Sequence, residues 1–133
     1  MAETIESSVG GTSCAIYCIF LNALASGLLK KPSWVSAAQY ALQALMTYTK
    51  ARVGDRTLMD TLCPFIDGLS HHSLEEAVRL AQAGAERTRV MSARLGRSSY
   101  LSDEQVLAAH VPDAGAYGLA ELLKGMAEAI KMF

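Results

Sequence analysis

This sequence has few prolines and cysteines and no excess of either charge, and each of these features excludes a class of protein. The chain has 12 basic and 13 acidic residues and no basic stripe, which argues against nucleic acid or an anionic membrane as a partner. The acidic, polar N-terminus does not have the pattern of a secretory signal. The most apolar run, residues 14–29, is shorter than the roughly 20 residues that span a bilayer. We interpret it as a buried helix.

The cysteine content indicates the cellular compartment. Cys14, Cys18 and Cys63 make an odd number and do not have the spacing of a small secreted protein. We therefore expect reduced thiols that fill the core of a cytoplasmic protein.

The low proline content and the prevalence of alanine and leucine predict an all-α fold. Only three prolines occur, and no run of β-branched residues alternates with polar ones. A length of 133 residues predicts one domain over residues 1–133. The hydrophobic fraction of 51% indicates a large core, or a surface that a partner covers.

Helix signals in the first half predict three helices. The first begins at a GGTS turn, residues 10–13, and ends near Pro32. The second covers about residues 32–50, with proline at its first position. The third begins at Thr57 and contains Pro64, which we expect to kink or split it.

The second half predicts two further helices. Ser73 and Glu76 form an S-x-x-E capping box before the fourth helix, which we expect to end at Gly96. A long connection with one short helical turn follows. The last helix is predicted over residues 113–132, with Asp113 as its N-cap.

Common catalytic and nucleotide-binding motifs are missing. The sequence has no Walker A loop, G-x-G-x-x-G, nucleophile elbow or H-E-x-x-H. His71 and His72, with Cys63 upstream, are too few and too widely spaced to predict a metal site. Four polar, glycine-bearing breaks remain, each at a helix end: GGTS (10–13), VGDRT (53–57), GRSSY (96–100) and PDAGA (112–116).

Each break, taken alone, has two interpretations. Glycines and free N–H groups at a helix start favour an anion such as phosphate, but ordinary capping explains the same residue types. In the third break, Arg97 suits bidentate phosphate recognition and Tyr100 suits stacking on a base. A solvated loop anchored by the tyrosine explains that break equally well.

Taken together, the four breaks resemble one family. GGTS, GDRT, GRSSYL and PDAGA, in this order and at these intervals, resemble the C-terminal nucleotide-binding domain of dihydroxyacetone kinases, and residues 5–25 are most similar to the fungal branch. The resemblance covers about residues 3–130. It implies an antiparallel helical barrel with ATP bound at one end, and phosphorylation of dihydroxyacetone as glycerone kinase activity.

The resemblance also implies roles for individual residues. The GGTS turn lies against the nucleotide phosphates, Leu58 lines the adenosine pocket, and Thr49 stands on the adenosine side where the family often has glycine. Arg97 and the turn that begins at Asp113 contact the nucleotide. The full set of implied nucleotide-binding residues is Gly10, Gly11, Thr12, Ser13, Thr49, Leu58, Arg97, Asp113, Ala114 and Gly115.

Several departures from the family pattern limit what we expect of the chain. Ala114 stands where the family usually has proline, which loosens the D-P-G turn, and Cys14 replaces a glycine. The D-x-D-x-G stretch that holds the family's metal, upstream of GGTS, does not occur in this sequence. We therefore expect the cofactors ATP and Mg²⁺, with the metal ligands outside this chain.

The expected partners follow from the same resemblance. In the full enzyme a separate domain binds dihydroxyacetone. We expect an incomplete barrel that lacks its N-terminal helices, with poor activity in isolation and a tendency to form homodimers. Two alternatives stay open. One is a non-catalytic helical module that binds nucleotide or protein, and the other is the family's lyase activity, which cyclises a flavin-containing dinucleotide. No catalytic residue is assigned.

Overall fold

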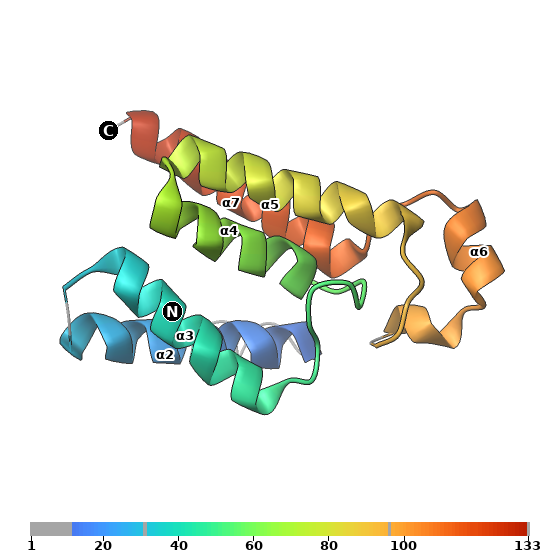
Figure 1. Cartoon of the computed structure of the whole chain (residues 1–133), viewed down its shortest axis with the longest axis horizontal. Coiled ribbons are helices and arrows are strands. Elements are labelled where there is room, and N and C mark those ends of the chain that lie inside the picture. The colour runs from blue at the N-terminus through green and yellow to red at the C-terminus, as the bar shows by residue number, and fades with distance from the viewer. Residues whose placement is uncertain (1–11, 31, 96, 133) are drawn as a thin grey trace. The chain divides into compact units, whose positions relative to one another are not determined.

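The computed structural model describes residues 12–30, 32–95 and 97–132, and these residues are helical with irregular connections (Figure 1). The α-helices are α2 (Thr12–Lys30), α3 (Trp34–Tyr48), α4 (Met59–His71), α5 (Leu74–Arg87), α6 (Asp103–Ala108) and α7 (Ala114–Met132). Two short 3-10 helices, η1 (Thr88–Val90) and η2 (Arg97–Tyr100), follow α5. No strand occurs within the described residues, so the predicted all-α class is confirmed.

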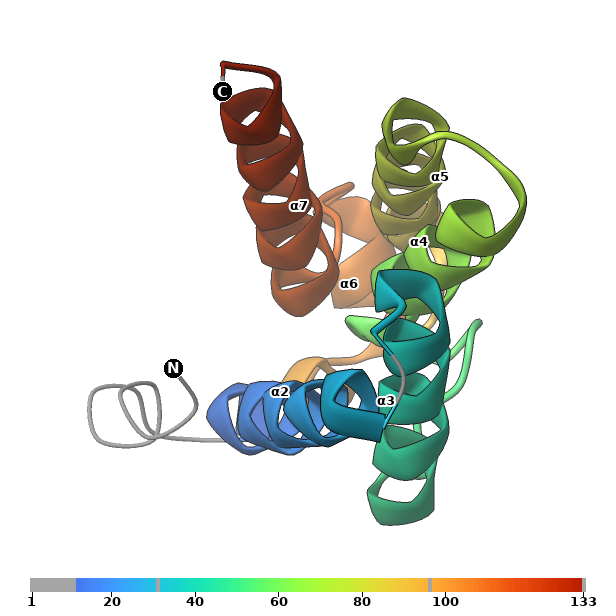
Figure 2. The same ribbon diagram turned by 90° about the vertical axis from the view of Figure 1, so that its left-hand side faces the viewer.

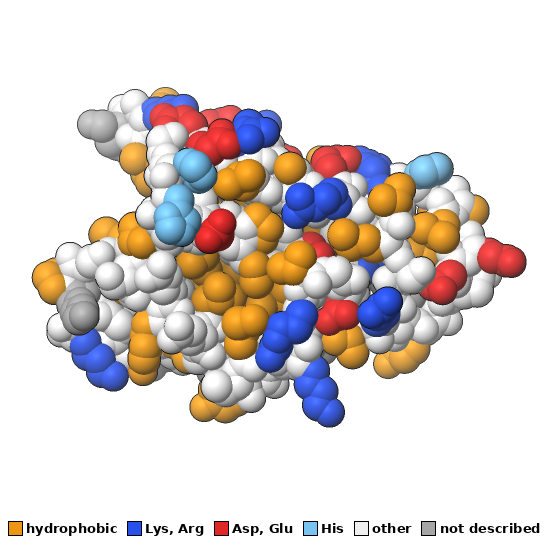
Figure 3. All heavy atoms as spheres, in the orientation of Figure 1, with side chains coloured by type: hydrophobic (Ala, Val, Ile, Leu, Met, Phe, Trp, Pro, Cys, Tyr) orange, Lys and Arg blue, Asp and Glu red, His pale blue; other side chains and the backbone are white. Residues whose placement is uncertain are grey.

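The chain divides into two compact units, Met1–Lys50 and Ala51–Phe133. The prediction of a single domain over residues 1–133 therefore stays a prediction. None of the described helices is both long enough and apolar enough to cross a lipid bilayer. On the face shown in Figure 3, the lysine and arginine side chains of the second unit are interspersed with acidic, hydrophobic and uncharged ones.

The first unit is a helical hairpin of α2 and α3, and Figure 2 shows the two helices crossing at a wide angle. They approach closely at Gly27, where an added β-carbon would lie 3.0 Å from the Cα atom of Ala37. The second helix begins at Trp34, two residues later than expected, because the Ser33 hydroxyl accepts a hydrogen bond from the backbone N–H of Ser36. Its buried face is Ala37, Ala38, Ala41 and Leu45.

The second unit is a bundle of α4, α5 and α7, in which α5 contacts both other helices. The small residues Ala85, Ala116 and Ala120 form a buried cluster between α5 and α7. Two glycines bring α4 and α5 together. A β-carbon on Gly68 would lie 2.7 Å from the Cα atom of Ala77, and one on Gly84 would lie 2.0 Å from the carbonyl oxygen of Asp60. The bundle therefore packs backbone against backbone.

The helix ends agree with the predicted capping signals at two places, Ser73 and Asp113. The Ser73 hydroxyl accepts from the backbone N–H of Glu76 at the start of α5, as expected. The reciprocal capping box, however, occurs in α6, between Ser102 and Gln105, in the connection where one short helical turn was expected. Asp113 caps α7, as predicted: its carboxylate accepts from the backbone N–H of Ala116 at 3.0 Å.

One helix prediction is narrowed and one needs correction. α4 runs unbroken past Pro64, so of the two expected effects of the proline, a kink or a split, the split does not occur. α5 ends at Arg87, nine residues before the expected stop at Gly96. The cause is Thr88, whose hydroxyl donates to the carbonyl of Ala85 at 2.5 Å while its backbone turns into the 3-10 helix η1.

Candidate functional site

The start of α7 lies against the start of α4. A β-carbon built on Gly115 would lie 3.2 Å from Oδ2 of Asp113, 3.6 Å from Cβ of Leu58 and 3.9 Å from the backbone nitrogen of Leu58. Leu58 is 5% exposed. The structure thus brings together Leu58, Asp113 and Gly115, which the sequence singled out. Ala114, the fourth such residue, lies between Asp113 and Gly115 as the first residue of α7. Glycine at 115 keeps this approach free of side-chain atoms.

Asp113 is fixed by its neighbours on both sides. Its Oδ2 accepts from the N–H of Ala116, and its own backbone N–H donates to the hydroxyl of Thr88 at 2.7 Å. The side chain is 13% exposed. A carboxylate at the N-terminus of a helix is also favoured by the helix dipole. The turn that begins α7 is therefore held from within α7 and from the end of α5.

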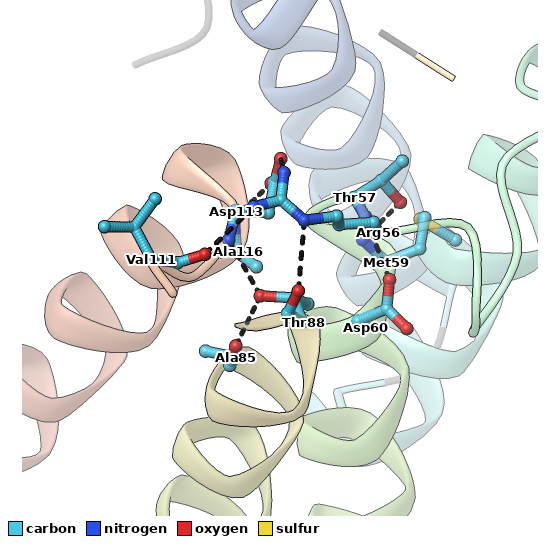
Figure 4. Close-up of polar contacts among 9 residues, drawn as sticks. All are labelled: Arg56, Thr57, Met59, Asp60, Ala85, Thr88, Val111, Asp113 and Ala116. Atoms are coloured by element: carbon cyan, nitrogen blue, oxygen red, sulfur yellow. Dashed lines mark hydrogen bonds and ion pairs between the residues drawn. The ribbon is translucent and has the colours of Figure 1, made fainter. Parts of the chain in front are cut away.

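Arg56 is the buried centre of the cluster in Figure 4. Its side chain is 4% exposed, its Nε donates to the carbonyl of Thr88 at 3.0 Å, and its Nη2 donates to the carbonyl of Val111 at 2.9 Å. Its Nη1 lies 3.9 Å from Oδ1 of Asp113. A guanidinium keeps its charge when buried, so the two carbonyls and the carboxylate offset the cost of removing it from water.

The loop that carries Arg56 has an unusual backbone. Gly54 has φ of 101° and Arg56 has φ of 58°, both in the left-handed region. Asp60, which is fully buried, stabilises this loop. Its Oδ1 accepts from the N–H of Gly54 at 2.6 Å and its Oδ2 accepts from the N–H of Thr57 at 2.9 Å. The carboxylate thus folds the segment before α4 into the shape that buries Arg56.

A second threonine ties α4 to the first turn of α7. Thr61 is fully buried, and its hydroxyl donates to the carbonyl of Ala116 at 2.9 Å. Thr61 and Thr88 were not predicted as contacts of the site, and Arg56 was included only as part of the VGDRT break and its GDRT motif. No local pattern reveals the contacts of these three residues, because each has partners at least 25 residues away along the chain.

The other predicted site residues lie outside this cluster or outside the described part of the chain. Thr49 is in the first unit, as the C-cap of α3, and its N–H donates to the carbonyl of Leu45 at 3.1 Å. The backbone of Thr12 and Ser13 opens α2, and that of Arg97 opens η2. Gly10 and Gly11 lie outside the described residues. That all of these residues converge with Leu58 and Asp113 stays a prediction.

The described residues do not fit a magnesium ion. No group of three or more His, Cys, Asp or Glu side chains that could hold a metal occurs among them. Both carboxylate oxygens of Asp60 are already engaged by backbone N–H groups, and Asp113 faces Ala116 and Arg56. Mg²⁺ takes six oxygen ligands in octahedral geometry, usually from one or two carboxylates whose oxygens are available to the ion, with water and phosphate oxygens as the rest. These two aspartates are instead acceptors that shape the loops.

These features define a class of protein: an all-helical chain in which two polar, glycine-bearing turns, residues 53–57 and 112–116, meet where α4 and α7 begin. Comparison with known proteins makes the class specific. The family model described as the DAK2 domain matches residues 1–128. The chain therefore belongs to the DAK2 domain family.

Named relatives agree with this assignment. The chain is 41% identical over 141 aligned residues to dihydroxyacetone kinase 2 of Saccharomyces cerevisiae, covering 97% of this chain and 24% of the relative. It is 36% identical over 145 aligned residues to the triokinase/FMN cyclase of Homo sapiens, covering 98% of this chain and 24% of the relative. The chain thus spans about a quarter of the length of these relatives.

A solved structure is similar as well. The crystal structure of the dihydroxyacetone kinase from C. freundii in complex with AMP-PNP and Mg²⁺ superposes with a TM-score of 0.73 at 30% identity. The match covers 96% of this chain and 22% of that chain. The similar region therefore includes both compact units of this chain and a minority of the crystallised protein.

Proposed function

We propose that this chain supplies part of the ATP site of an enzyme that phosphorylates dihydroxyacetone. The observation that carries the proposal is the match, over 96% of this chain, to a dihydroxyacetone kinase that was crystallised with AMP-PNP and Mg²⁺. The 41% identity to a yeast dihydroxyacetone kinase supports the same substrate. In that reaction the γ-phosphate of ATP is transferred to a hydroxyl group of the three-carbon ketose.

The cluster at the start of α7 forms one side of the proposed site. In this proposal Leu58 lines the adenosine side, and the turn from Asp113 to Gly115 contacts the nucleotide beside it. The approach of Gly115 to Leu58 supports this assignment, because the side chain of a larger residue at 115 would crowd Leu58 and the carboxylate of Asp113. Thr49 belongs to the same adenosine side in this proposal.

The phosphate side of the proposed site comes from two other turns. Gly10, Gly11, Thr12 and Ser13 face the phosphates with backbone N–H groups and hydroxyls, and the Arg97 guanidinium neutralises phosphate charge. Enzymes of phosphoryl transfer work mainly by positioning and charge stabilisation. We assign no step to Mg²⁺ here, because the described residues offer no ligand set for it.

The proposal includes a partner. This chain covers about a quarter of its relatives, and we propose that a dihydroxyacetone-binding domain provides the phosphoryl acceptor in the full enzyme. A homodimer of this chain and a cytoplasmic location remain part of the proposal.

Calorimetric titration of the 133-residue chain with ATP, with and without MgCl₂, tests the nucleotide site. We expect saturable binding of one ATP. Arg97→Ala should weaken it by about 1.5–3 kcal/mol, the contribution of a hydrogen bond to a charged group. Arg94→Ala, which removes an exposed arginine from the same loop, is the matched control and should leave the affinity unchanged. Absence of binding by the wild-type chain would contradict the proposal.

A second function is favoured by one relative. The human protein named triokinase/FMN cyclase is 36% identical to this chain, so the same nucleotide site is a candidate for cyclising a flavin-containing dinucleotide. Incubation with FAD, followed by chromatography for a cyclic flavin product and AMP, distinguishes this activity from transfer of phosphate to dihydroxyacetone. Binding of ATP without either product, when the dihydroxyacetone-binding domain is supplied, would favour the non-catalytic module.

A further inference from the structure

We propose that Arg56 and Thr88 are positioning residues, which hold the turn from Asp113 to Gly115 against Leu58 and so shape the adenosine side of the site. The inference rests on the proposed function, since it assigns a role within the same nucleotide site. Both residues contact Asp113, the first residue of the turn.

Thr88 is the junction of this arrangement. It is fully buried, and its hydroxyl both accepts and donates a hydrogen bond. It accepts from the N–H of Asp113 at 2.7 Å and donates to the carbonyl of Ala85 at 2.5 Å. Its carbonyl accepts from Nε of Arg56. One residue thus connects the end of α5, the loop before α4 and the start of α7.

Arg56 fixes the opposite side of the same turn. Its guanidinium donates from Nε to the carbonyl of Thr88 and from Nη2 to the carbonyl of Val111. Thr88 and Val111 lie near the two ends of the connection between α5 and α7. The ends of that connection are therefore held together by one planar group. Lysine cannot replace it, because a single ammonium on a flexible stem does not reach both carbonyls in the fixed geometry of a guanidinium.

The consequence for the site is specific. The N–H of Asp113 has the Thr88 hydroxyl as its partner, and the next residues carry the Gly115–Leu58 approach. Without the hydroxyl, the turn loses its attachment to the end of α5, and its remaining attachments are the bond from Thr61 to Ala116 and the contacts of Arg56. The bundle core of α4 and α5, which packs through Gly68 and Gly84, does not depend on these bonds.

The test uses the full chain and four variants. Thr88→Val keeps the shape of the side chain and removes the hydroxyl, whereas Thr88→Ser keeps the hydroxyl and serves as the rescue. Arg56→Lys removes the fork and keeps the charge. Arg79→Lys makes the same change in an exposed arginine, which pairs with Glu76, and serves as the control.

Two measurements are compared: amide hydrogen exchange at Asp113 and in α5, and the dissociation constant for ATP. We expect Thr88→Val and Arg56→Lys to speed exchange at Asp113 about tenfold relative to α5 and to weaken ATP binding by a similar factor, as loss of one buried hydrogen bond predicts. Thr88→Ser and Arg79→Lys should match the wild type in both. If Thr88→Val does not fold, Arg56→Lys gives the same comparison.

Exchange at Asp113 that rises no more than exchange in α5 overturns the inference, because the residues would then contribute only to general stability. Faster exchange with unchanged ATP affinity overturns it too. If the wild-type chain binds no ATP at all, the proposed function fails and the nucleotide role of this turn fails with it. The two failures are distinguishable, since the first two outcomes include ATP binding by the wild type.

Discussion

Replacing Gly84 by alanine should destabilise the α4–α5–α7 bundle, although alanine is the better helix former. The added β-carbon would lie 2.0 Å from the carbonyl oxygen of Asp60, a backbone atom that no rotamer change moves away. Overpacking costs up to about 3 kcal/mol where neighbours give way, and more where they do not. Alanine regains about 1 kcal/mol of helix propensity. We therefore expect a net loss of about 2 kcal/mol or more.

The matched control is Gly125→Ala in α7. An added β-carbon there meets no atom within 4 Å, so only the propensity gain of about 0.5–1 kcal/mol remains. Urea unfolding followed by circular dichroism at 222 nm compares both variants with the wild type. A Gly84→Ala protein that unfolds at the wild-type urea concentration, or above it, would refute the proposed backbone contact between α4 and α5.

Three further predictions follow from single side chains. Asp60→Asn replaces one oxygen of a fully buried carboxylate by an NH₂ group, so that one of two backbone N–H groups loses its acceptor, and should cost about 1–3 kcal/mol in urea unfolding; an unchanged midpoint would show that the carboxylate does not shape the loop. The hydrogen bond from Arg89 lowers the pKa of the exposed Glu86 carboxyl below 4.5, so the small contribution of this pair is complete above pH 4.5 and is lost as the pH falls through the lowered folded-state pKa. Carbon NMR titration should show that pKa return toward 4.5 in Arg89→Gln, and no change would rule out the pairing. Burial, helped by the charge of Asp60, raises the pKa of the Cys63 thiol, so iodoacetamide at pH 8 should modify it more slowly than glutathione; mass spectrometry that finds equal rates would contradict this.

The sequence predicts the fold class well, because helix signals are local. Ser73 and Asp113 cap the helices that follow them, as their residue types indicate. The end of α5 is predicted wrongly, because residues 88–95 contain no glycine or proline to stop a helix. The helix ends at Arg87 since Thr88 is bonded to Arg56 and Asp113, which approach only in the folded chain. Tertiary bonds here override propensity.

The candidate site is predicted in part, for a similar reason. Leu58 and Gly115 were singled out through motifs, and the structure brings them together. Thr88 lies in none of these motifs, and Arg56, although it stands in GDRT, was not predicted to hold the turn. Arg56 and Thr88 are 32 residues apart in sequence, and Thr88 and Asp113 are 25 apart. A motif identifies the residues that its family shares at a turn, but it does not specify which distant side chains hold that turn in place.

The last prediction concerns how the turn is stiffened. Ala114 is the first residue of α7, where the resemblance to dihydroxyacetone kinases leads us to expect proline. Proline suits this position, because the N–H of a first helical residue has no partner within the helix and the fixed φ is already helical. Ala114→Pro should therefore raise the free energy of unfolding by about 0.4–1 kcal/mol, by restricting the unfolded chain. In a Thr88→Val background the same change should recover part of the lost ATP affinity, since a ring then restricts the turn that the hydroxyl no longer holds. If proline at 114 destabilises the protein, or restores nothing in that background, the hydrogen bonds from Thr88 and Arg56 are not what sets the turn.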